Sequence, residues 1–206
     1  MKALVLGASG FLGSYAGFAL DKAGWDVTGA SRSPARGYSK SIDLGSLGDI
    51  RSAIRSQPWD VVINCVAIAN HEQCESDPSS ARLINQELPG MWAYRSWQNA
   101  SQFVHFSTDA VFDGSSSGPY SEDDVTGAPS VYGQTKRVGE EAVLSANPDA
   151  LVFRTNFFGW SHYRARGILD FFANGLESGA SMTGFRDYVV SSLYVGHLFE
   201  LMIEAL

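Results

Sequence analysis

The feature that most constrains the fold is a glycine-rich turn that follows the first few residues. An apolar run, Lys2–Leu6, leads directly into Gly-Ala-Ser-Gly-Phe-Leu-Gly at 7–13, and a helical pattern over 14–23 comes next, closed by Gly24. A short, wholly apolar run of this kind is typical of a parallel strand that is covered on both faces. The order strand, glycine turn, helix therefore predicts the start of an α/β domain built on a parallel sheet.

The spacing of the glycines indicates what the turn binds. Gly7 permits a tight turn, Gly10 lets the backbone approach a pyrophosphate, and Gly13 lets the helix pack close to the strand. The N–H groups at the start of the helix would face the anion. The pattern G-x-x-G-x-x-G is a variant of the usual G-x-G-x-x-G, and the alternative is a glycine-rich turn in an ordinary βαβ unit. The predicted cofactor contacts in this turn are Gly7, Ser9, Gly10, Phe11, Leu12 and Gly13.

The second predicted strand starts at Trp25 and leads into Ser31 and Arg32. A site selective for NAD usually carries Asp or Glu here to bind the ribose hydroxyls. Ser31 and Arg32 would suit a 2′-phosphate instead, which favours NADPH; the alternative is that Arg32 simply points into water. A third short extended piece closes at Asp43 and Leu44, which we expect to border the adenine.

The middle of the chain predicts another central strand, over residues 61–67. Small residues at its end would allow the nicotinamide half of a dinucleotide to approach. Asp77 followed by proline then indicates a helix start, and Asn85 on that helix would be a buried polar group that needs a partner. The residues expected near the nicotinamide are Ala67, Ile68 and Ala69.

A further strand, Gln102–Ser107, ends on Ser-Thr-Asp, and a helix beginning after Ser130 carries Tyr132 and Lys136. Residues four apart share one helix face. An ammonium near a phenol lowers the pKa of the phenol, which makes the tyrosine a usable proton donor at neutral pH. The Thr108 hydroxyl would then hold a substrate carbonyl against Tyr132, although an exposed tyrosine beside a solvated lysine gives the same spacing.

Polar residues follow three of the predicted strands, at the point where each strand ends. They are the turn at 7–13, the run 107–109, and Thr155 with Asn156. In an open parallel sheet, ligands bind across the carboxyl ends of the strands. The sequence therefore predicts one site at this edge, which is the outline of a carbonyl-reduction site served by a dinucleotide.

Composition excludes several other classes of function. The chain has 206 residues, 45% of them hydrophobic, which is enough for one sizeable core. A formal net charge of -7 without a basic run disfavours nucleic acid and anionic membranes as partners. With neither a transmembrane-length apolar run nor a signal peptide, we expect a cytoplasmic protein. Cys65 and Cys74 fit neither a disulfide framework nor a metal site.

The chain changes character after residue 160. We expect residues 1–160 to form the dinucleotide-binding domain and residues 161–206 a small C-terminal substrate lobe, with helices over 168–176 and 193–206 and extended pieces over 181–190. Because the last helical pattern runs to Leu206 without a closing polar segment, we expect this lobe to be partial.

These motifs together resemble the extended short-chain dehydrogenase/reductase superfamily, and within it the dTDP-4-dehydrorhamnose reductase (sugar-nucleotide reductase) branch. The resemblance rests on GASGFLG, VVINCVA, STDAVFDG, YGQTKRVGE and RTNFFGW, which follow the family's order over residues 1–160. It implies a Rossmann-type, doubly wound parallel sheet. It also implies NADPH as the cofactor, with NADH left open, and a nucleotide-linked 4-keto sugar as the substrate.

The resemblance also assigns residues by position. Tyr132 would protonate the C4 oxygen as hydride arrives, Lys136 would also bind the nicotinamide ribose, and Asp109 would assist the geometry of the substrate. The implied catalytic set is Thr108, Asp109, Tyr132 and Lys136. Further implied cofactor contacts are Ser107, Tyr132, Lys136 and Thr155. Implied substrate contacts are Thr108, Asp109, Val111, Phe112, Tyr132 and Asn156.

Two other activities are compatible with the same motifs. The first is an epimerase or dehydratase that keeps its NAD, against which Arg32 argues because it replaces an acidic residue. The second is a binding protein like the regulatory subunit of methionine adenosyltransferase, which keeps the fold without turnover. The sequence departs from the reductase pattern at Ala110, where the family usually has an aromatic residue. A homodimer is left open.

Overall fold

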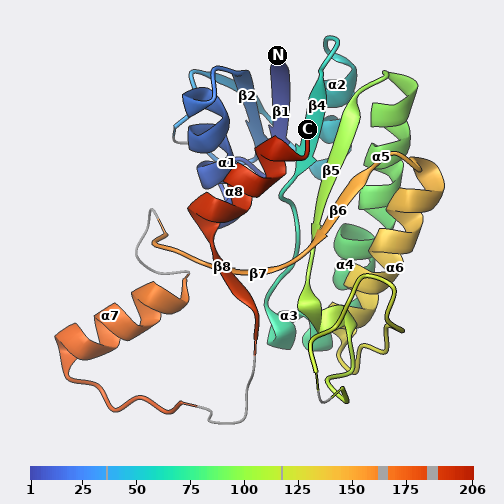
Figure 1. Ribbon diagram of the computed structural model, residues 1–206. Coiled ribbons are helices and arrows are strands. Elements are labelled where there is room, and N and C mark those ends of the chain that lie inside the picture. The colour runs from blue at the N-terminus through green and yellow to red at the C-terminus, as the bar shows by residue number, and fades with distance from the viewer. Residues whose placement is uncertain (36, 117, 162–166, 185–189) are drawn as a thin grey trace.

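The computed structural model describes residues 1–35, 37–116, 118–161, 167–184 and 190–206. Its centre is a six-stranded, wholly parallel sheet in the order β3-β2-β1-β4-β5-β6 (Figure 1). The strands are β1 (Lys2–Leu6), β2 (Asp26–Ser31), β3 (Lys40–Asp43), β4 (Val61–Asn64), β5 (Gln102–Ser107) and β6 (Leu151–Arg154). The order runs outward in both directions from β1 and β4, which is the doubly wound topology predicted from the sequence.

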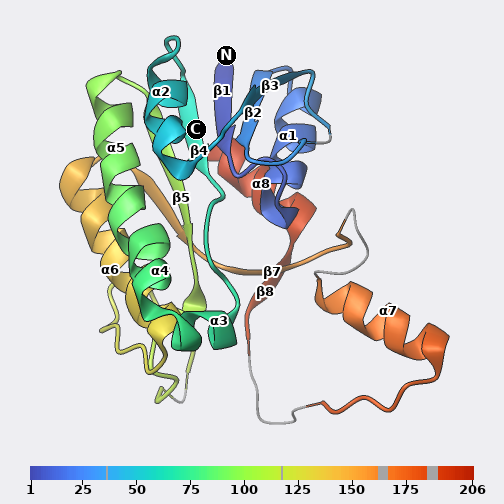
Figure 2. The same ribbon diagram turned by 180° about the vertical axis from the view of Figure 1, so that it is seen from behind.

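Helices cover both faces of this sheet (Figures 1 and 2). The helices are α1 (Phe11–Lys22), α2 (Ile50–Arg55), α3 (His71–Ser76), α4 (Pro78–Arg82), α5 (Leu88–Gln98), α6 (Val131–Ala146), α7 (Ile168–Ser178) and α8 (Val195–Glu204). Short 3₁₀ turns occupy Leu47–Asp49 and Asp109–Val111, and a π-turn, Leu83–Glu87, joins α4 to α5. A second sheet pairs β7 (Asn156–Phe158) with β8 (Ser192–Tyr194) in parallel.

Alternation along the strands builds one apolar core on each face. On β1, Ala3 and Val5 face a cluster formed with α1 and α8, whereas Leu4 and Leu6 face a cluster formed with α2, α5 and α6. All four side chains are fully buried. The period of two in a strand explains this division, and it confirms that the opening apolar run is a strand covered on both sides.

Several predicted boundaries shift in the structure. Helix α1 begins at Phe11 rather than at residue 14, because its first turn follows directly on the Gly10 N-cap. The strand predicted over 61–67 ends at Asn64, after which the chain leaves the sheet. The helix predicted from Asp77 begins as expected, with the Asp77 side chain capping Ser80 N, but it is interrupted by the π-turn around Asn85.

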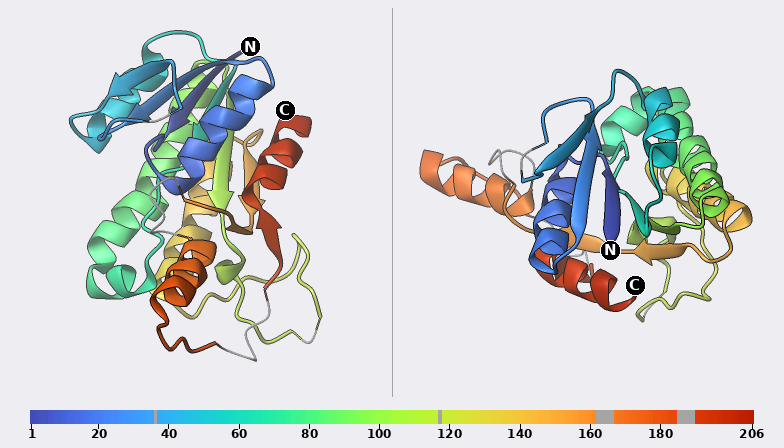
Figure 3. Two further views of the ribbon diagram at one scale, coloured as in Figure 1. Left: turned by 90° about the vertical axis from the view of Figure 1, so that its left-hand side faces the viewer. Right: turned by 90° about the horizontal axis from the view of Figure 1, so that it is seen from above.

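The last helix, α8, packs into the apolar core that Ala3 and Val5 of β1 form with α1. The sequence predicts a C-terminal lobe over residues 161–206, whereas four residues of α8 are buried against β1 and α1: Val195, Leu198, Phe199 and Met202. Helix α7, by contrast, stands apart from the main sheet (Figure 3), with Phe171 53% exposed. Helix α8 therefore packs against the main sheet, and the division of the chain at residue 160 stays a prediction. The extended pieces predicted over 181–190 fall partly outside the described residues.

The position of α8 predicts a large difference between two phenylalanine truncations. Phe199 is fully buried and lies edge-on to Phe106 at 5.7 Å between ring centroids. We expect Phe199→Ala to lower the free energy of unfolding by about 3–5 kcal/mol, and Phe171→Ala, the control in α7, by about 0.5 kcal/mol or less. Urea unfolding of both variants measures this. Equal effects would show that α8 does not belong to the core.

No helix in the described part of the chain is long and apolar enough to cross a membrane.

Candidate active site

The glycine turn after β1 has the geometry of an anion cradle. Gly7 has a φ of 78°, a conformation that side-chain-bearing residues rarely adopt. A Cβ on Gly13 would lie 2.9 Å from Ala8 Cα and closer still to Gly7 O, so the helix approaches the turn only because Gly13 has no side chain. The N-cap of α1 is Gly10, which has no side chain to cap the first turn, so the N–H groups of this turn are the donors a pyrophosphate would use. These residues fit the predicted dinucleotide.

The ends of β2 and β3 lie side by side beyond this turn. Ser31 is paired with Asp43 across the strands, and Leu44 N donates to Ser31 O at 3.0 Å. The Ser31 hydroxyl is buried and donates to Ser33 O at 2.6 Å, which fixes the start of the loop, whereas Arg32 is exposed. Tyr38 then ties the loop back to α1, because its hydroxyl donates to Gly13 O.

A buried amide holds the segment that follows β4. Asn85 Oδ1 accepts from Ile68 N at 2.9 Å, and Asn85 Nδ2 donates to Ile68 O at 2.9 Å and to Thr135 Oγ1 at 3.3 Å. Asn85 is fully buried, so the expectation that it needs a partner is confirmed. Asn85 lies within the π-turn Leu83–Glu87, and its side chain reaches the Ile68 backbone after β4. The backbone of 67–69 is thereby held at the carboxyl end of β4, with Ala67 and Ala69 exposed.

Thr108 and Tyr132 come together at the end of β5. Thr108 is buried; its Oγ1 accepts from Ala110 N at 3.1 Å and donates to Asp109 Oδ1 at 3.1 Å. The Thr108 side chain is near enough to the Tyr132 phenol to act on its pKa, and the His71 ring packs on the Tyr132 ring at 4.7 Å between centroids. Burial raises the pKa of Tyr132, and the hydrogen bond with Thr108 lowers it by a smaller amount. The expected lowering by Lys136 is therefore not what the structure shows.

The reason lies in the partners of Lys136. Its side chain is 2% exposed, and its Nζ donates to Phe106 O at 2.6 Å and lies 3.3 Å from His105 Nε2. Burial lowers the pKa of Lys136 to about 8. Because the amine is held by β5, its charge does not dominate the Tyr132 phenol. Tyr132 thus enters the site as a protonated donor with a raised pKa, and Lys136 as an amine whose pKa is lowered to about 8.

The end of β4 connects this pair to the glycine turn. A Cβ on Gly7 would meet the Cys65 carbonyl group at 3.1 Å, and the charge of Lys136 acts on the Cys65 thiol, whose pKa burial raises. The turn, the end of β4 and the buried lysine are therefore neighbours, as expected from the convergence of strand ends.

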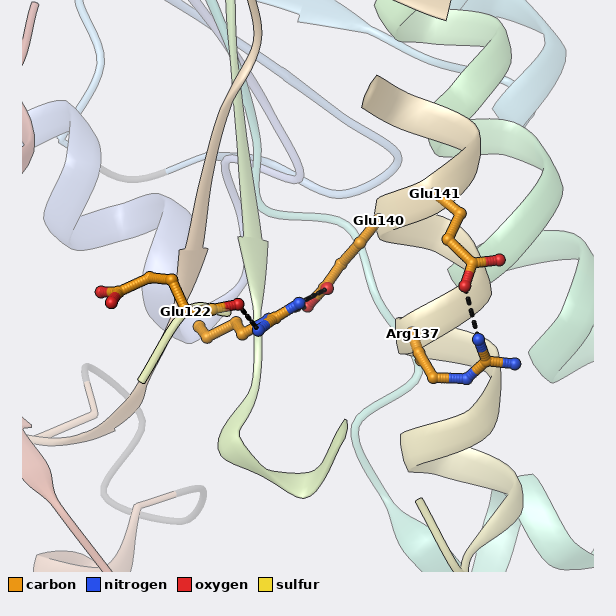
Figure 4. A network of polar contacts seen from close by, with 5 residues as sticks. Glu122, Arg137, Glu140 and Glu141 are labelled. Carbon is orange, nitrogen blue, oxygen red and sulfur yellow. Dashed lines mark hydrogen bonds and ion pairs between the residues drawn. The ribbon is translucent and has the colours of Figure 1, made fainter. Parts of the chain in front are cut away.

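An ion pair that sequence reasoning missed holds the loop beside Thr108. Arg154, at the end of β6, donates to Glu140 Oε2 at 2.9 Å and to Glu122 O at 3.0 Å (Figure 4). Its guanidinium lies 5.2 Å from the centre of the Phe112 ring, which stacks on Tyr120 at 4.2 Å. The loop that contains Tyr120 and Glu122 is thus tied to the sheet. Within α6, the helix that carries Glu140, Arg137 forms a separate pair with Glu141 (Figure 4).

The remaining predicted contacts are divided between two places. Val111 is buried in the 3₁₀ turn after Asp109. Thr155 follows Arg154, which pairs with Ser107, so Thr155 lies beside the end of β5. Asn156, however, opens β7 and pairs with Ser192 in the second sheet. Its role as a substrate contact stays a prediction.

Comparison with known proteins places the chain in a family. The family model described as the RmlD substrate binding domain matches residues 1–205. The probable low-salt glycan biosynthesis reductase Agl14 of Haloferax volcanii is 33% identical over 99% of this chain and 64% of its own length. A dTDP-4-dehydrorhamnose reductase of Streptomyces griseus is 39% identical over 71% of this chain and 46% of its own length.

Solved structures agree with the sequence comparison. A dTDP-4-dehydrorhamnose reductase ortholog of Clostridium acetobutylicum has a TM-score of 0.85 and 25% identity, covering 100% of this chain and 70% of that one. The chain spans about two thirds of the length of Agl14 and about half of the length of the Streptomyces griseus reductase. It belongs to the RmlD substrate binding domain family, and so to the dTDP-4-dehydrorhamnose reductase branch of the extended short-chain dehydrogenase/reductases.

Proposed function

We propose that the chain is an NADPH-dependent reductase of a nucleotide-linked 4-keto sugar. The observation that carries the proposal is the meeting of Thr108, Tyr132 and Lys136 at the end of β5, next to a glycine cradle at the end of β1. The reductase names of its relatives support the same reaction class.

Each group has a role that follows from its geometry. NADPH, when bound, supplies the hydride. The Thr108 hydroxyl and the Tyr132 phenol would both bond to the C4 oxygen of the sugar, and Tyr132, kept protonated by its raised pKa, would give that oxygen its proton. In the structure the single Thr108 hydroxyl proton is donated to Asp109, so this hydroxyl would turn from Asp109 to the C4 oxygen when the sugar binds. Lys136 would bind the nicotinamide ribose and restore the proton of Tyr132.

The cofactor and the sugar would occupy different parts of the chain. We assign the cofactor to the main sheet, at Gly7–Gly13, the ends of β2 to β4 and Lys136, and the nucleotide half of the substrate to the part after residue 160, α8 excepted. Phe112 is proposed to contact the sugar from the side of the main sheet, and Asn156 from the side of the second sheet.

Turnover of a panel of nucleotide-linked 4-keto sugars tests the reaction class. We expect one of these sugars to support oxidation of NADPH, followed by the loss of its absorbance at 340 nm. If the protein binds NADPH and no sugar is reduced, the chain is a dinucleotide-binding regulator of a partner, and size-exclusion chromatography with candidate partners becomes the next step.

The exposed arginine after β2 predicts the choice of cofactor. We expect Arg32→Asp to lower the ratio of kcat/KM for NADPH to that for NADH at least roughly tenfold, because one charge-assisted hydrogen bond to the 2′-phosphate is lost. Arg55→Asp, in the last turn of α2, makes the same change of charge away from the site and should leave the ratio unchanged. An unchanged ratio in Arg32→Asp would mean that Arg32 points into water.

A further inference from the structure

A buried histidine that the proposed reaction does not use faces the amine of Lys136. His105 of β5 is fully buried and is the register partner of Asn64 on β4. The two side chains meet, with Asn64 Nδ2 3.0 Å from His105 Nδ1. On the other side of the imidazole, His105 Nε2 lies 3.3 Å from Lys136 Nζ. The three residues come from neighbouring strands and the helix that covers them.

The backbone fixes which way the Asn64 amide points. Its Oδ1 accepts from Val66 N at 2.9 Å. Rotating the amide by half a turn would set two N–H donors against each other at Val66, so the Nδ2 group must face the imidazole. His105 Nδ1 is therefore an acceptor and carries no proton.

The proton of the imidazole then has one place left. Burial, with the nearby Lys136 charge, holds the pKa of His105 well below its usual range, so the ring is neutral and carries one proton. With Nδ1 accepting from Asn64, that proton lies on Nε2, which faces Lys136. An ammonium has no lone pair to accept it, whereas a neutral amine has one.

From this geometry we infer that Asn64 and His105 form a positioning pair that presents an Nε2–H to Lys136 and stabilises its neutral amine form. The inference deepens the proposed function and depends on it only for its catalytic consequence. Lys136 Nζ still donates to Phe106 O at 2.6 Å, which either form of the lysine can do.

Among the residues that the structure describes, the other titratable groups around Lys136 do not supply a free counter-charge. Cys65, after β4, has a thiol pKa raised by burial and stays neutral. Tyr132, one turn earlier on α6, has a raised pKa and is also neutral. Glu140, one turn later, favours the ammonium, but both of its carboxylate oxygens bond to Arg154 of β6.

The consequence concerns the return of the proton. When Tyr132 has given its proton to the sugar oxygen, its phenolate must regain one. Lys136 Nζ donates to Phe106 O rather than to the phenol, so a proton lost by the Lys136 ammonium would reach the phenolate through an intervening group and leave an amine, which then regains a proton from solvent. The Nε2–H of His105 stabilises the amine in this cycle. It therefore helps Lys136 to change its protonation state near neutral pH rather than to remain a fixed cation.

Nitrogen-15 NMR of the cofactor-free protein tests the first step directly. The chain has 4 histidines, and long-range proton–nitrogen spectra show which ring nitrogen of each one is protonated. We expect His105, identified by its loss in His105→Leu, to carry its proton on Nε2 and to remain neutral from pH 5 to 9. A proton on Nδ1, or titration near the ordinary histidine pKa, would overturn the inference.

An isosteric change at Asn64 inverts the arrangement. The Asn64→Asp carboxylate would accept from both Val66 N and His105 Nδ1–H, which leaves an Nε2 lone pair facing Lys136. We expect the imidazole proton to move to Nδ1 and the titration midpoint of Lys136 to rise. The midpoint is followed by carbon-13 NMR of the lysine side chains, with Lys136→Arg to identify the signal. An Nε2–H that persists in Asn64→Asp would contradict the pair.

Removing the imidazole separates its effect from burial. His105→Leu keeps Lys136 in an apolar setting but removes the Nε2–H, so the midpoint of Lys136 should rise by about one pKa unit, the equivalent of one hydrogen bond. An unchanged midpoint would assign the lowered pKa to burial alone and overturn the inference. Because these readouts need neither cofactor nor sugar, their failure is distinct from failure of the reductase proposal.

Discussion

Tyr132→Phe is expected to lower kcat for NADPH-dependent reduction by about 10²–10⁴-fold, the range that general acid catalysis contributes. The change keeps the aromatic ring that packs on His71 and removes only the hydroxyl beside Thr108. NADPH affinity, measured by fluorescence titration, should change by less than about threefold, because the phenol acts on the sugar oxygen and the glycine turn is untouched.

A second tyrosine controls for general effects of losing a hydroxyl. Tyr94, on the exposed face of α5, accepts from Gln98 Nε2 at 3.0 Å, and Tyr94→Phe should retain full activity. If Tyr132→Phe and Tyr94→Phe behave alike, Tyr132 is not the proton donor, and the assignment of the catalytic set fails.

Gly13→Val is expected to abolish most NADPH binding, raising Kd at least about 100-fold, and to lower the free energy of unfolding by about 1–3 kcal/mol. A Cβ at this position would lie 2.9 Å from Ala8 Cα and even closer to Gly7 O. Either the turn or the start of α1 must then move, and both belong to the proposed pyrophosphate cradle. Titration with NADPH and urea unfolding measure the two effects.

Gly24→Ala separates loss of stability from loss of the cradle. Gly24 ends the first helical segment with a φ of 83° and has open space where a Cβ would stand. Alanine there is strained by about 1–2 kcal/mol, yet lies away from the turn. We expect Gly24→Ala to be destabilised but to bind NADPH normally. If Gly13→Val binds NADPH as well as Gly24→Ala does, the turn is an ordinary glycine loop.

Local sequence signals predicted the elements that carry the site. The apolar run of β1, the glycine turn and the start of α6 after the Ser130 N-cap each depend on neighbouring residues, so a single sequence contains the information. The need of Asn85 for a partner was also visible, because an amide within a helix that packs on a sheet must form hydrogen bonds.

Other features depend on packing between distant segments. The apolar stripe of α8 indicates a buried face but not which surface covers it, so the sequence did not show that Phe199 joins the first core. The direction of the Tyr132 pKa shift depends on burial, which a four-residue spacing does not reveal. The Glu140–Arg154 pair joins α6 to β6, and nothing in the local pattern of either residue identifies its partner.

His105 combines a feature that the local sequence reveals with one that depends on packing between distant segments. A histidine within an otherwise apolar strand was a visible signal, because a buried polar ring requires hydrogen-bond partners. Its partners could not be named from the sequence, since Asn64 and Lys136 meet it only through the strand order and the position of α6.

The fate of the hydride tests the central proposal most directly. We would incubate the protein with NADPH deuterated at the transferable position and the nucleotide-linked 4-keto sugar that supports turnover, and examine the product by NMR. The proposal predicts one deuterium at C4 of the sugar for each NADPH oxidised, with the transfer largely lost in Tyr132→Phe. Deuterium that remains on a tightly bound cofactor, or that never reaches C4, would contradict it.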